Sequence, residues 1–465
     1  MHVAGSIHAD VLSRAPGWLG IPDDVNDLLP QLWSRNVSKD PDGVLTAAGL
    51  LVTEIAEQVG TPVYVVDEED LRARAREFAD AFAGWDVYYA GKSFLCTAVA
   101  SWVSEEGLGV DVCTGGELAV ALRAGVDPRR IGLHGNNKSD AELELALDAG
   151  VGRIIADSFD ELDRLVRLVA AGRRSARPRI MVRVTTGVEA HTHEYIATAH
   201  EDQKFGFSIA SGQALAALLR VHNAPELDLA GIHSHIGSQI FDAEGFAVAA
   251  RRTLGLHAEL AAATGLQMPE MDLGGGFGIA YTSTDTPATP AQLAVAMRRI
   301  VETECAVLDV AVPHLSIEPG RAISGPSAFA LYTVGTVKQV RLDGDAVRTY
   351  VAVDGGMSDN IRTALYAAEY SATLASRRSA AGPAISRVVG KHCEGGDILV
   401  RDEFLPADIA PGDMVAVPAS GAYSRSMASN YNHVPRPPVI AVRDGRLQTL
   451  LRRETLDDIL RLDVG

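Results

Sequence analysis

Between residues 87 and 317 the chain alternates short apolar runs with longer stretches in which apolar residues recur at helical spacing. The first four runs begin at residues 87, 109, 131 and 153, an interval of 22 residues that suits one strand, one helix and two tight loops. The eight runs are Val87–Ala90, Gly109–Cys113, Ile131–His134, Arg153–Ala156, Arg179–Val184, Ala230–His235, Glu270–Leu273 and His314–Ile317. Eight strands alternating with helices predict a (β/α)8 barrel of the TIM type, although an open, doubly wound sheet fits the same alternation.

The segments between the runs carry signals for helices. Capping boxes precede two of them, at Ser139 with Glu142 and at Ser158 with Glu161. Residues 243–264 are rich in alanine and leucine and predict a longer helix. The long interval between the fifth and sixth strands contains residues 187–206, which we interpret as a loop over the mouth of the barrel.

Beyond Gly325 the pattern changes to β-branched runs with few helical stretches between them. The clearest runs are Tyr332–Arg341, Arg348–Val353 and Met414–Val417. A similar run before the first barrel strand, Val63–Val66, is expected to join them. The pattern therefore predicts an α/β chain with two domains: a barrel formed by residues 68–325, and a β-rich, sandwich-like or barrel-like domain formed from both termini, residues 1–67 and 326–465.

Composition narrows the possible partners. Hydrophobic residues make up 47% of the chain and the mean hydropathy is +0.07, which excludes a mostly disordered protein. The net charge of −18 disfavours nucleic acid and anionic membranes as partners. No apolar run approaches the ~20 residues that cross a bilayer. The first residues lack the basic and apolar regions of a signal peptide, and the four cysteines form no CxxC pair, so we expect a cytoplasmic protein.

Residues capable of chemistry collect at the carboxyl ends of the predicted barrel strands, where the active sites of such barrels lie. They are Lys92, Asp111, His134, His233, His235, Ser238, Gly275, Gly276, Glu318, Gly320 and Arg321. Each of them alone has an ordinary explanation, such as a solvated lysine or a glycine that only turns the chain. Their common position indicates one site.

Two of these strand ends suggest specific chemistry. Lys92 lies in the segment YYAGKS, whose aromatic and small residues could remove its amine from water and favour the neutral nucleophile that forms a Schiff base. The glycine run at residues 274–278 lacks the spacing of a dinucleotide-binding fingerprint. Together with Ser238 and Arg321 it would offer backbone N–H groups, a hydroxyl and a guanidinium, which are the components of a phosphate-binding loop.

Other features leave alternatives open. Glu318 could form a structural ion pair with Arg321, or it could hold a pyridine nitrogen in its protonated state. His233 and His235 lie on one strand and could bind a metal. Because no cysteine or carboxylate pattern with metal-ligand spacing accompanies them, we favour packed or stacking histidines and expect no metal.

The segments YAGKS, GVDVCTGGEL, HGNNKS, HSHIGSQI, DLGGGFG, EPGR, KHCEGGD and GAYS occur in this order along the chain. Together they resemble the diaminopimelate decarboxylases, pyridoxal-phosphate enzymes related to alanine racemase and ornithine decarboxylase. The resemblance extends from Thr61 to Ser424, and residues 187–208 are similar to that family in particular. It implies pyridoxal 5'-phosphate as cofactor and the decarboxylation of meso-2,6-diaminopimelate to L-lysine and CO2, the last step of lysine biosynthesis.

In the barrel, the resemblance implies covalent attachment of the cofactor to Lys92, stacking of His235 on its ring and a contact of Glu318 with the pyridine nitrogen. The residues implied to bind the phosphate are Ser238, Gly275, Gly276 and Arg321. The implied cofactor site is completed by Asp111, Gly320 and Tyr423.

In the β-rich domain, the resemblance implies that Cys393 and Glu394 reach the active site of the other subunit, so we expect a homodimer with shared sites. The implied substrate-binding residues are Arg321, Arg362, Tyr366, Glu394 and Tyr423. Cys393 is the expected proton donor, since thiols are largely protonated at neutral pH, and Lys92 is the second candidate. The family pattern Cys-Glu-Ser-Gly-Asp has Gly395 in place of serine, which puts a hydroxyl contact there in doubt.

The substrate has two amino-acid ends, and the end that does not react needs a cation for its carboxylate and an anion for its ammonium group. Arg362 can bind the carboxylate through two hydrogen bonds, and Glu394 can pair with the ammonium. Ornithine has no distal carboxylate, so Arg362 favours a dicarboxylate substrate. The alternatives are a decarboxylase of the same fold acting on ornithine, arginine or lysine, a racemase, and a metal-dependent hydrolase.

Overall fold

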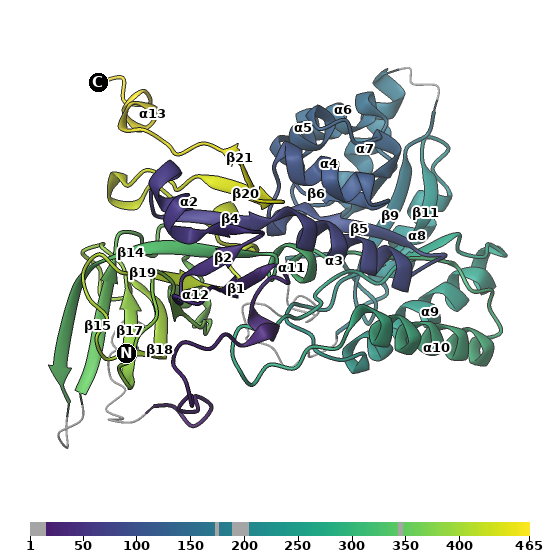
Figure 1. Ribbon diagram of the computed structural model, residues 1–465. Helices are drawn as coiled ribbons and strands as arrows, with labels where there is room; N and C mark the ends of the chain where they lie inside the picture. The colour runs from purple at the N-terminus through teal and green to yellow at the C-terminus, as the bar shows by residue number, and fades with distance from the viewer. Residues whose placement is uncertain (1–14, 173–175, 188–203, 343–346) are drawn as a thin grey trace. The chain divides into compact units, whose positions relative to one another are not determined.

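The computed structural model describes residues 15–172, 176–187, 204–342 and 347–465 (Figure 1). The chain forms two compact units. The barrel unit consists of Arg72–Gly278 and Pro287–Ile323, and the β-rich unit consists of Met1–Leu71, Ile279–Thr286 and Ser324–Gly465. No helix in the described part of the chain is long and apolar enough to cross a membrane.

The barrel unit contains eight parallel strands that close on themselves. In spatial order they are β5 (Asp86–Ala90), β6 (Gly109–Val112), β7 (Ile131–Leu133), β8 (Arg153–Ala156), β9 (Arg179–Thr185), β11 (Asp228–Ser234), β12 (Glu270–Asp272) and β13 (His314–Ile317). Closure comes from the pairing of β8 with β9 and of β13 with β5. All eight predicted strands are confirmed, and the open sheet is wrong because each strand has a neighbour on both sides.

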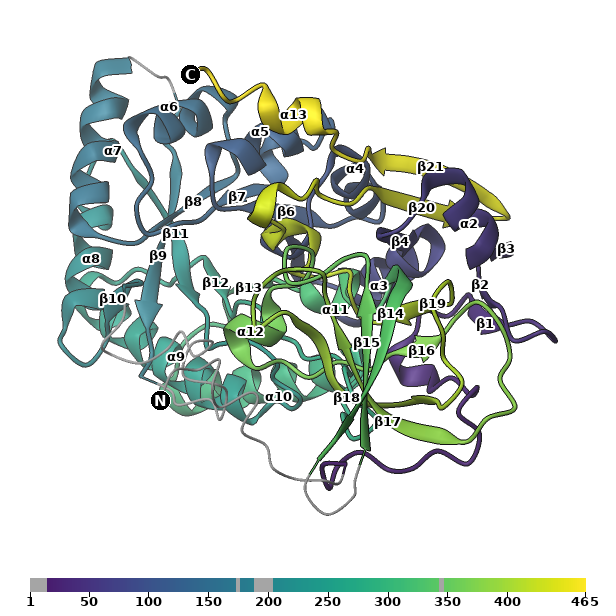
Figure 2. The ribbon, with the colours of Figure 1, turned by 90° about the vertical axis from the view of Figure 1, so that its left-hand side faces the viewer.

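Helices surround these strands in the two ribbon views (Figures 1 and 2). They are α3 (Glu68–Ala81), α4 (Thr97–Glu105), α5 (Gly115–Arg123), α6 (Asp140–Ala149), α7 (Phe159–Gly172), α8 (Gln213–His222), α9 (Glu244–Thr264) and α10 (Pro290–Leu308). Since helices cover the outside and side chains fill the inside, β6, β7 and β8 are buried at every position. This explains why the sequence shows continuous apolar runs rather than alternation.

One of the two predicted capping boxes forms as expected. Ser139 accepts the N–H of Glu142, and Glu142 accepts the N–H of Ser139. At the start of α7, Ser158 accepts the N–H of Glu161 at 3.2 Å, but the Glu161 carboxylate binds the buried ammonium group of Lys138 at 2.7 Å instead of completing the box. A buried cation needs a counter-charge more than a helix needs a second cap.

The predicted loop over residues 187–206 lies almost wholly outside the described residues. Its described end leads into the short strand β10 (Phe207–Ser208), which pairs with β9. The backbone N–H of Gly206 donates to the Asp157 carboxylate at 2.6 Å, so this end of the segment is attached to the residue directly after β8.

The β-rich unit is built around a sheet that joins both ends of the chain. Its strands are, in spatial order, β18 (Ile398–Pro406), β17 (Pro383–Val389), β15 (Val347–Val353), β14 (Ala328–Arg341), β4 (Val63–Asp67), β20 (Val439–Arg443) and β21 (Arg446–Leu451). As expected, the run Val63–Val66 pairs with the strand that begins at Ala328. The strand β19 (Met414–Val417) pairs with β14 and with β16 (Thr373–Leu374), and β1 (Val37–Lys39), β2 (Leu45–Ala47) and β3 (Leu50–Leu51) form a small separate sheet.

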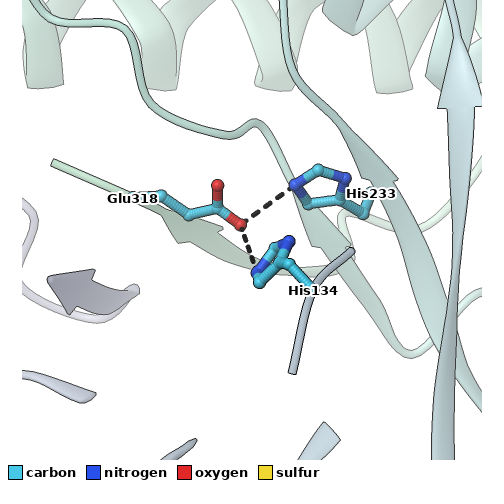
Figure 3. Close-up of side chains that lie close together, drawn as sticks. All are labelled: His134, His233 and Glu318. Atoms are coloured by element: carbon cyan, nitrogen blue, oxygen red, sulfur yellow. Dashed lines mark ion pairs between the residues drawn. The ribbon is translucent and has the colours of Figure 1, made fainter. Parts of the chain in front are cut away.

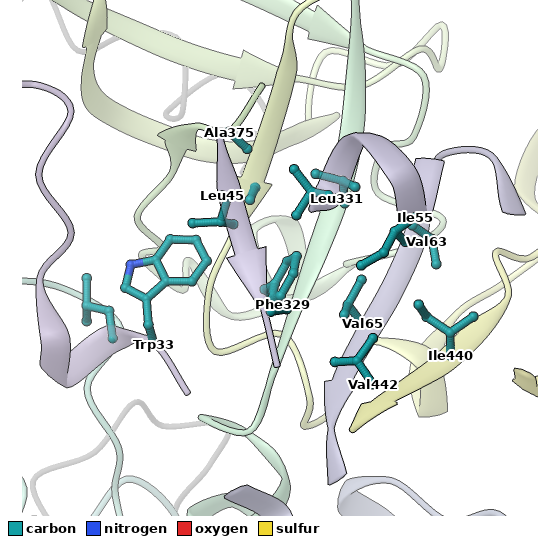
Figure 4. Close-up of a cluster of buried hydrophobic side chains, with 14 of the residues drawn as sticks. Trp33, Leu45, Ile55, Val63, Val65, Phe329, Leu331, Ala375, Ile440 and Val442 are labelled. Atoms are coloured by element: carbon teal, nitrogen blue, oxygen red, sulfur yellow. The ribbon is translucent and has the colours of Figure 1, made fainter. Parts of the chain in front are cut away.

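The core of this unit brings together segments that are far apart in sequence (Figure 4). Trp33 and Leu45 come from the N-terminal part, Phe329 from β14 and Ile440 from β20, and all are buried. Burying one such side chain contributes roughly 1.5–3 kcal/mol to folding. The α-helices of the unit are short: α2 (Val52–Val59), α12 (Arg362–Tyr366) and α13 (Leu456–Leu460).

The segment Ile279–Thr286 belongs to the β-rich unit although barrel segments flank it on both sides in the sequence. Ala280 packs in the core of the β-rich unit, and the ring of Tyr281 lies 5.0 Å from that of Tyr370. Because the segment forms no regular strand, the hydrophobic pattern carries no signal of this excursion.

Candidate functional site

The barrel unit contains a cavity at the carboxyl ends of its strands. Its wall includes Lys92, Asp111, Cys113, Glu117, His134, Arg183, Phe205, His233, His235 and Glu318. Six residues predicted from the sequence therefore line one cavity: Lys92, Asp111, His134, His233, His235 and Glu318. They come from the carboxyl ends of five strands, as expected for the active face of a barrel.

Lys92 lies in a single turn of 3-10 helix, η2 (Gly91–Ser93), directly after β5. Its side chain is exposed, so the predicted desolvation by the neighbouring aromatic residues is wrong. Tyr88 instead packs against the guanidinium of Arg153, and the hydroxyl of Tyr89 donates to the carbonyl of Phe94. Both aromatic side chains therefore contact groups other than the lysine.

Glu318 comes directly after β13, and two imidazoles approach the same oxygen of its carboxylate (Figure 3). Its Oε1 is 3.0 Å from Nε2 of His233 and 3.2 Å from Nε2 of His134. Burial alone would raise the pKa of the Glu318 carboxyl, but the two histidines outweigh burial and hold that pKa below its usual value. Burial also lowers the pKa of His134 well below that of free histidine. The site therefore contains a carboxylate whose ionised form is favoured by the two imidazoles beside it.

Asp111, on β6, lies beside the same cluster. Its Oδ1 is 3.2 Å from Nε2 of His134 and 3.5 Å from Nη2 of Arg153. Burial raises the pKa of the Asp111 carboxyl to about 7. Small changes in the neighbouring charges therefore decide whether Asp111 is ionised near neutral pH.

His235, just after β11, has a different environment from His233. Its Nδ1 accepts the backbone N–H of Gly275 at 3.2 Å. Burial lowers the pKa of His235 well below the usual value. A neutral ring in a fixed orientation on the cavity wall suits stacking on a flat, aromatic ligand.

The ends of β5, β11, β12 and β13 approach one another closely because glycine is present at three positions. A Cβ on Gly275 would lie 2.1 Å from the carbonyl oxygen of Glu318. One on Gly276, whose φ is +104°, would lie 2.3 Å from the carbonyl oxygen of Gly237, and one on Gly320 would lie 2.8 Å from that of Ala90. Each glycine thus lets one backbone segment contact another, which no other residue type allows.

Beside these glycines, Nη2 of Arg321 donates to Oγ of Ser238 at 2.9 Å. A guanidinium, a hydroxyl and closely packed backbone amides form a cradle suited to a phosphate dianion. The amine of Lys92 suits an aldehyde, and the anionic Glu318 suits a protonated ring nitrogen. The residues present therefore fit pyridoxal phosphate.

The structure groups a different set of possible metal ligands from the one predicted. The ligand atoms of His134, His233 and Glu318 lie within 4.8 Å of one another, whereas the predicted alternative used His233 with His235. The guanidinium of Arg153 lies 3.9 Å from the same oxygen of Glu318 and would repel a divalent cation. The positive charge of Arg153 therefore favours a cluster of ion pairs over a metal centre.

In the β-rich unit, Arg362 begins α12 and is 4% exposed. Its guanidinium lies 4.9 Å from the ring centre of Tyr281 and 5.5 Å from that of Tyr370, and it donates to the hydroxyl of Tyr370. Among the described residues it forms no ion pair with a carboxylate. A buried guanidinium held only by tyrosines can bind an external anion. Tyr366, at the other end of the helix, is half-buried.

Cys393 and Glu394 occupy an exposed loop with a fixed base. The Asp397 carboxylate accepts the backbone N–H of His392 at 2.7 Å and that of Met357 at 2.6 Å. The thiol of Cys393 and the carboxylate of Glu394 therefore project from an anchored turn of the β-rich unit.

Tyr423 is half-buried and has a φ of +60°. A bulky residue in this left-handed region stores roughly 1–3 kcal/mol of strain, and such strain is concentrated at functional positions. The conformation is consistent with the site role expected for Tyr423.

Arg183 has no predicted role, although it lines the cavity and lies 4.4 Å over the ring of Phe205. His134 lies at a predicted strand end, but its contacts with Asp111 and Glu318 could not be inferred from that position. The sequence does contain one signal for such roles, which is a charged residue in a strand that is otherwise apolar. It occurs at Arg183 in RIMVRV and at Arg153, the first residue of RIIA. Charged residues in buried strands usually have a partner.

Comparison with known proteins agrees with this chemistry. The sequence family described as pyridoxal-dependent decarboxylase, pyridoxal binding domain, matches residues 68–325. Diaminopimelate decarboxylase of Mycobacterium tuberculosis is 54% identical over 448 residues, covering 95% of this chain and all of the relative. The enzyme of that name from Bacillus subtilis is 42% identical over 426 residues, covering 91% of this chain and 95% of the relative.

Solved structures with a similar fold agree with the sequence comparison. Diaminopimelate decarboxylase from M. jannaschii in complex with L-lysine superposes with a TM-score of 0.85 at 28% identity, covering 93% of this chain and 98% of that one. A lysine/ornithine decarboxylase from Vibrio vulnificus, at 21% identity and a TM-score of 0.71, shares the fold and covers 84% of this chain and 97% of its own. The match to this domain and the identity with full-length relatives agree with the phosphate cradle of the barrel. They show that the chain belongs to the diaminopimelate decarboxylase family of pyridoxal-dependent decarboxylases.

Proposed function

We propose that this protein uses pyridoxal phosphate to decarboxylate meso-2,6-diaminopimelate to L-lysine and CO2. The observation that carries the proposal is the cavity in which the Lys92 amine, the Glu318 carboxylate and the His235 ring lie together. The relatives of that name at 42–54% identity over most of the chain support the substrate.

Bound pyridoxal phosphate supplies an aromatic ring that accepts the electron pair left when CO2 departs. We infer that the Lys92 amine holds the aldehyde end, that His235 lies against the ring and that Glu318 keeps a proton on the ring nitrogen. The residues that would hold the phosphate are Ser238, Gly275, Gly276, Gly320 and Arg321. We assign Asp111 and Tyr423 to the same cofactor site.

The reaction ends with a proton transfer to the carbon that lost the carboxylate. We infer that the Cys393 thiol donates this proton, with the Lys92 ammonium as second candidate. Both Cys393 and Glu394 are exposed in a single chain, which is what residues serving a second subunit require. We therefore propose a homodimer in which each active site uses this loop from its partner.

We also propose that the enzyme acts in the cytoplasm. All four cysteines are free, with Cys96 and Cys305 buried and Cys113 and Cys393 exposed. Free exposed thiols suit a reducing compartment.

We propose that Arg362 binds the distal carboxylate of the substrate, with Glu394, Tyr366, Tyr423 and Arg321 as further substrate contacts. Arg362→Gln is expected to lower kcat/KM for diaminopimelate about 10- to 100-fold, mostly through KM, because one charge-assisted interaction is lost. Steady-state kinetics and cofactor content of the purified variant measure this. Arg443→Gln removes an exposed arginine of the same unit that pairs with Glu68, and it should leave both parameters unchanged.

The decisive test of the substrate is a parallel measurement of CO2 release from meso-diaminopimelate, ornithine, arginine and lysine. We expect turnover of diaminopimelate with lysine as product and at least about 10²-fold weaker activity on the other three, since they leave the buried Arg362 without its anion. Turnover of ornithine or arginine but not of diaminopimelate would replace this proposal by a decarboxylase of the same fold with another substrate.

A further inference from the structure

The interior of the barrel contains a buried guanidinium behind the cavity wall, in a region that apolar side chains usually fill. Arg153, the first residue of β8, is 2% exposed and does not line the cavity itself. Its Nη2 binds Oδ2 of Asp272 at 2.6 Å and its Nη1 donates to Oγ of Ser316 at 2.9 Å. The hydroxyl of Ser316 donates to the same Asp272 oxygen at 2.7 Å, and the guanidinium lies 3.7 Å from the ring centre of Tyr88. Residues of β5, β12 and β13 therefore hold the guanidinium that extends from β8.

The same guanidinium faces the carboxylates of the cavity. Nη2 of Arg153 lies 3.5 Å from Oδ1 of Asp111 and 3.9 Å from Oε1 of Glu318. Both oxygens of the Asp272 carboxylate have partners, since Oδ1 also accepts the backbone N–H of Gly274 at 2.7 Å. The titratable and charged groups that face the cluster from the surrounding strands are Tyr88, Asp111, His134, Arg183, His233 and Asp272.

The local backbone leaves room for this arrangement. A Cβ on Gly132 would lie 2.4 Å from Oδ1 of Asp111 and 3.1 Å from Nε of Arg153. Any other residue at position 132 would push the aspartate and the arginine apart. The contact between the two charges thus depends on a glycine in the middle of a strand, where glycine is otherwise unfavourable.

Stability alone does not account for the buried charge. Replacing a buried ion pair by apolar side chains of similar volume is often neutral or stabilising, because desolvation costs about as much as the attraction contributes. An interior cation is useful, however, where neighbouring carboxylates must stay ionised away from water. Glu318 is such a carboxylate, since its role in the proposed function requires the anion.

We propose that Arg153 is a positioning residue for the decarboxylation: through its contacts with Asp272, Ser316, Asp111 and Glu318, it keeps the Glu318 side chain anionic and oriented toward the cofactor ring. The inference rests on the proposed cofactor chemistry but not on the identity of the amino-acid substrate. Arg153 touches neither cavity nor substrate and acts only through the carboxylates in front of it.

The test compares Arg153→Met, which keeps most of the side-chain volume without the charge, with Arg153→Lys, which keeps the charge. The absorbance spectrum of the bound cofactor and the kcat of the holoenzyme are measured from pH 5.5 to 9. Arg153 favours the ionised form of Asp111, whose pKa is about 7 and whose Oδ1 it faces at 3.5 Å, so the acid limb of both profiles should move about one pH unit upward in Arg153→Met. Loss of the cation beside Glu318 should also lower kcat about tenfold at neutral pH. Arg153→Lys should restore most of the wild-type profile.

Two further variants separate this role from a purely structural one. Arg387→Met removes an equally buried guanidinium of the β-rich unit, 1% exposed and 3.5 Å from Asp402, and should lower the melting temperature without moving either profile. Ser316→Ala removes one hydrogen bond that orients Arg153 and should shift the profiles in the same direction by a smaller amount, which keeps the proposal testable if Arg153→Met fails to fold.

Unchanged profiles in both Arg153→Met and Ser316→Ala, with only a lower melting temperature, would overturn the proposal. The spectral titration needs no substrate, so it still tests Arg153 if the wild-type enzyme fails to decarboxylate diaminopimelate. Failure of the spectral shift, with normal turnover of diaminopimelate, would reject the role of Arg153 alone.

Discussion

Replacing Lys92 by alanine is expected to abolish covalent cofactor attachment and to lower turnover by on the order of 10³-fold or more, because no other amine takes its place in the covalent step. Borohydride reduction and then peptide mass spectrometry should find the pyridoxyl group on Lys92 in the wild-type protein and nowhere in the variant. Lys338→Ala, which removes an exposed lysine of β14, serves as the control and should behave as the wild type. Wild-type activity in Lys92→Ala would contradict the assignment of the site.

The same variant tests the sharing of active sites between subunits. Cys393→Ala should lose most turnover while still binding the cofactor. In a mixed dimer of one Lys92→Ala chain and one Cys393→Ala chain, a shared site would combine the intact lysine of one chain with the intact thiol of the other. Activity should then recover to a fraction of the wild-type value. Heterodimers isolated with two different affinity tags that show no recovery would argue against shared sites.

Glu318→Gln is expected to lower kcat by on the order of 10²-fold, since a neutral amide of the same size cannot hold a proton on the ring nitrogen. The two histidines hold the pKa of Glu318 below its usual value, so its carboxylate stays ionised through the neutral and mildly acidic range. Loss of activity as the pH falls through 7 is expected to come from Asp111, whose pKa is about 7 and which gains a proton there.

Steady-state kinetics and the spectrum of the bound cofactor check this prediction. Glu318→Gln should retain the covalent adduct at Lys92 while the cofactor absorbance changes. Glu270→Gln, at the opposite end of β12 in an exposed pair with Arg179, is a matched control and should leave kcat unchanged. A kcat of Glu318→Gln within a few-fold of the wild type would refute the role of this carboxylate.

Much of the fold could be predicted because its signals are local. Each barrel strand is a run such as Arg153–Ala156 that is buried on both sides, and each helix has its own capping and periodic residues, as in the reciprocal bonds of Ser139 and Glu142. Closure of the sheet between β8 and β9 was not predictable from periodicity, because an open sheet and a barrel need the same alternation. The excursion of Ile279–Thr286 into the β-rich unit likewise depends on contacts with residues far away in sequence.

For the site, the resemblance of the ordered motifs to a known family predicted the cofactor. The residues directly after each strand suggested a lysine suited to a Schiff base and a glycine-rich loop suited to a phosphate, and these two roles stay predictions. The charge states and partners required the folded barrel. Glu318 meets His134, His233 and Arg153 only because four strands converge, and Lys92 is exposed although its neighbours in sequence are aromatic. The electrostatic energy of a buried group depends on every charge within a few ångströms, and those charges come from distant parts of the sequence.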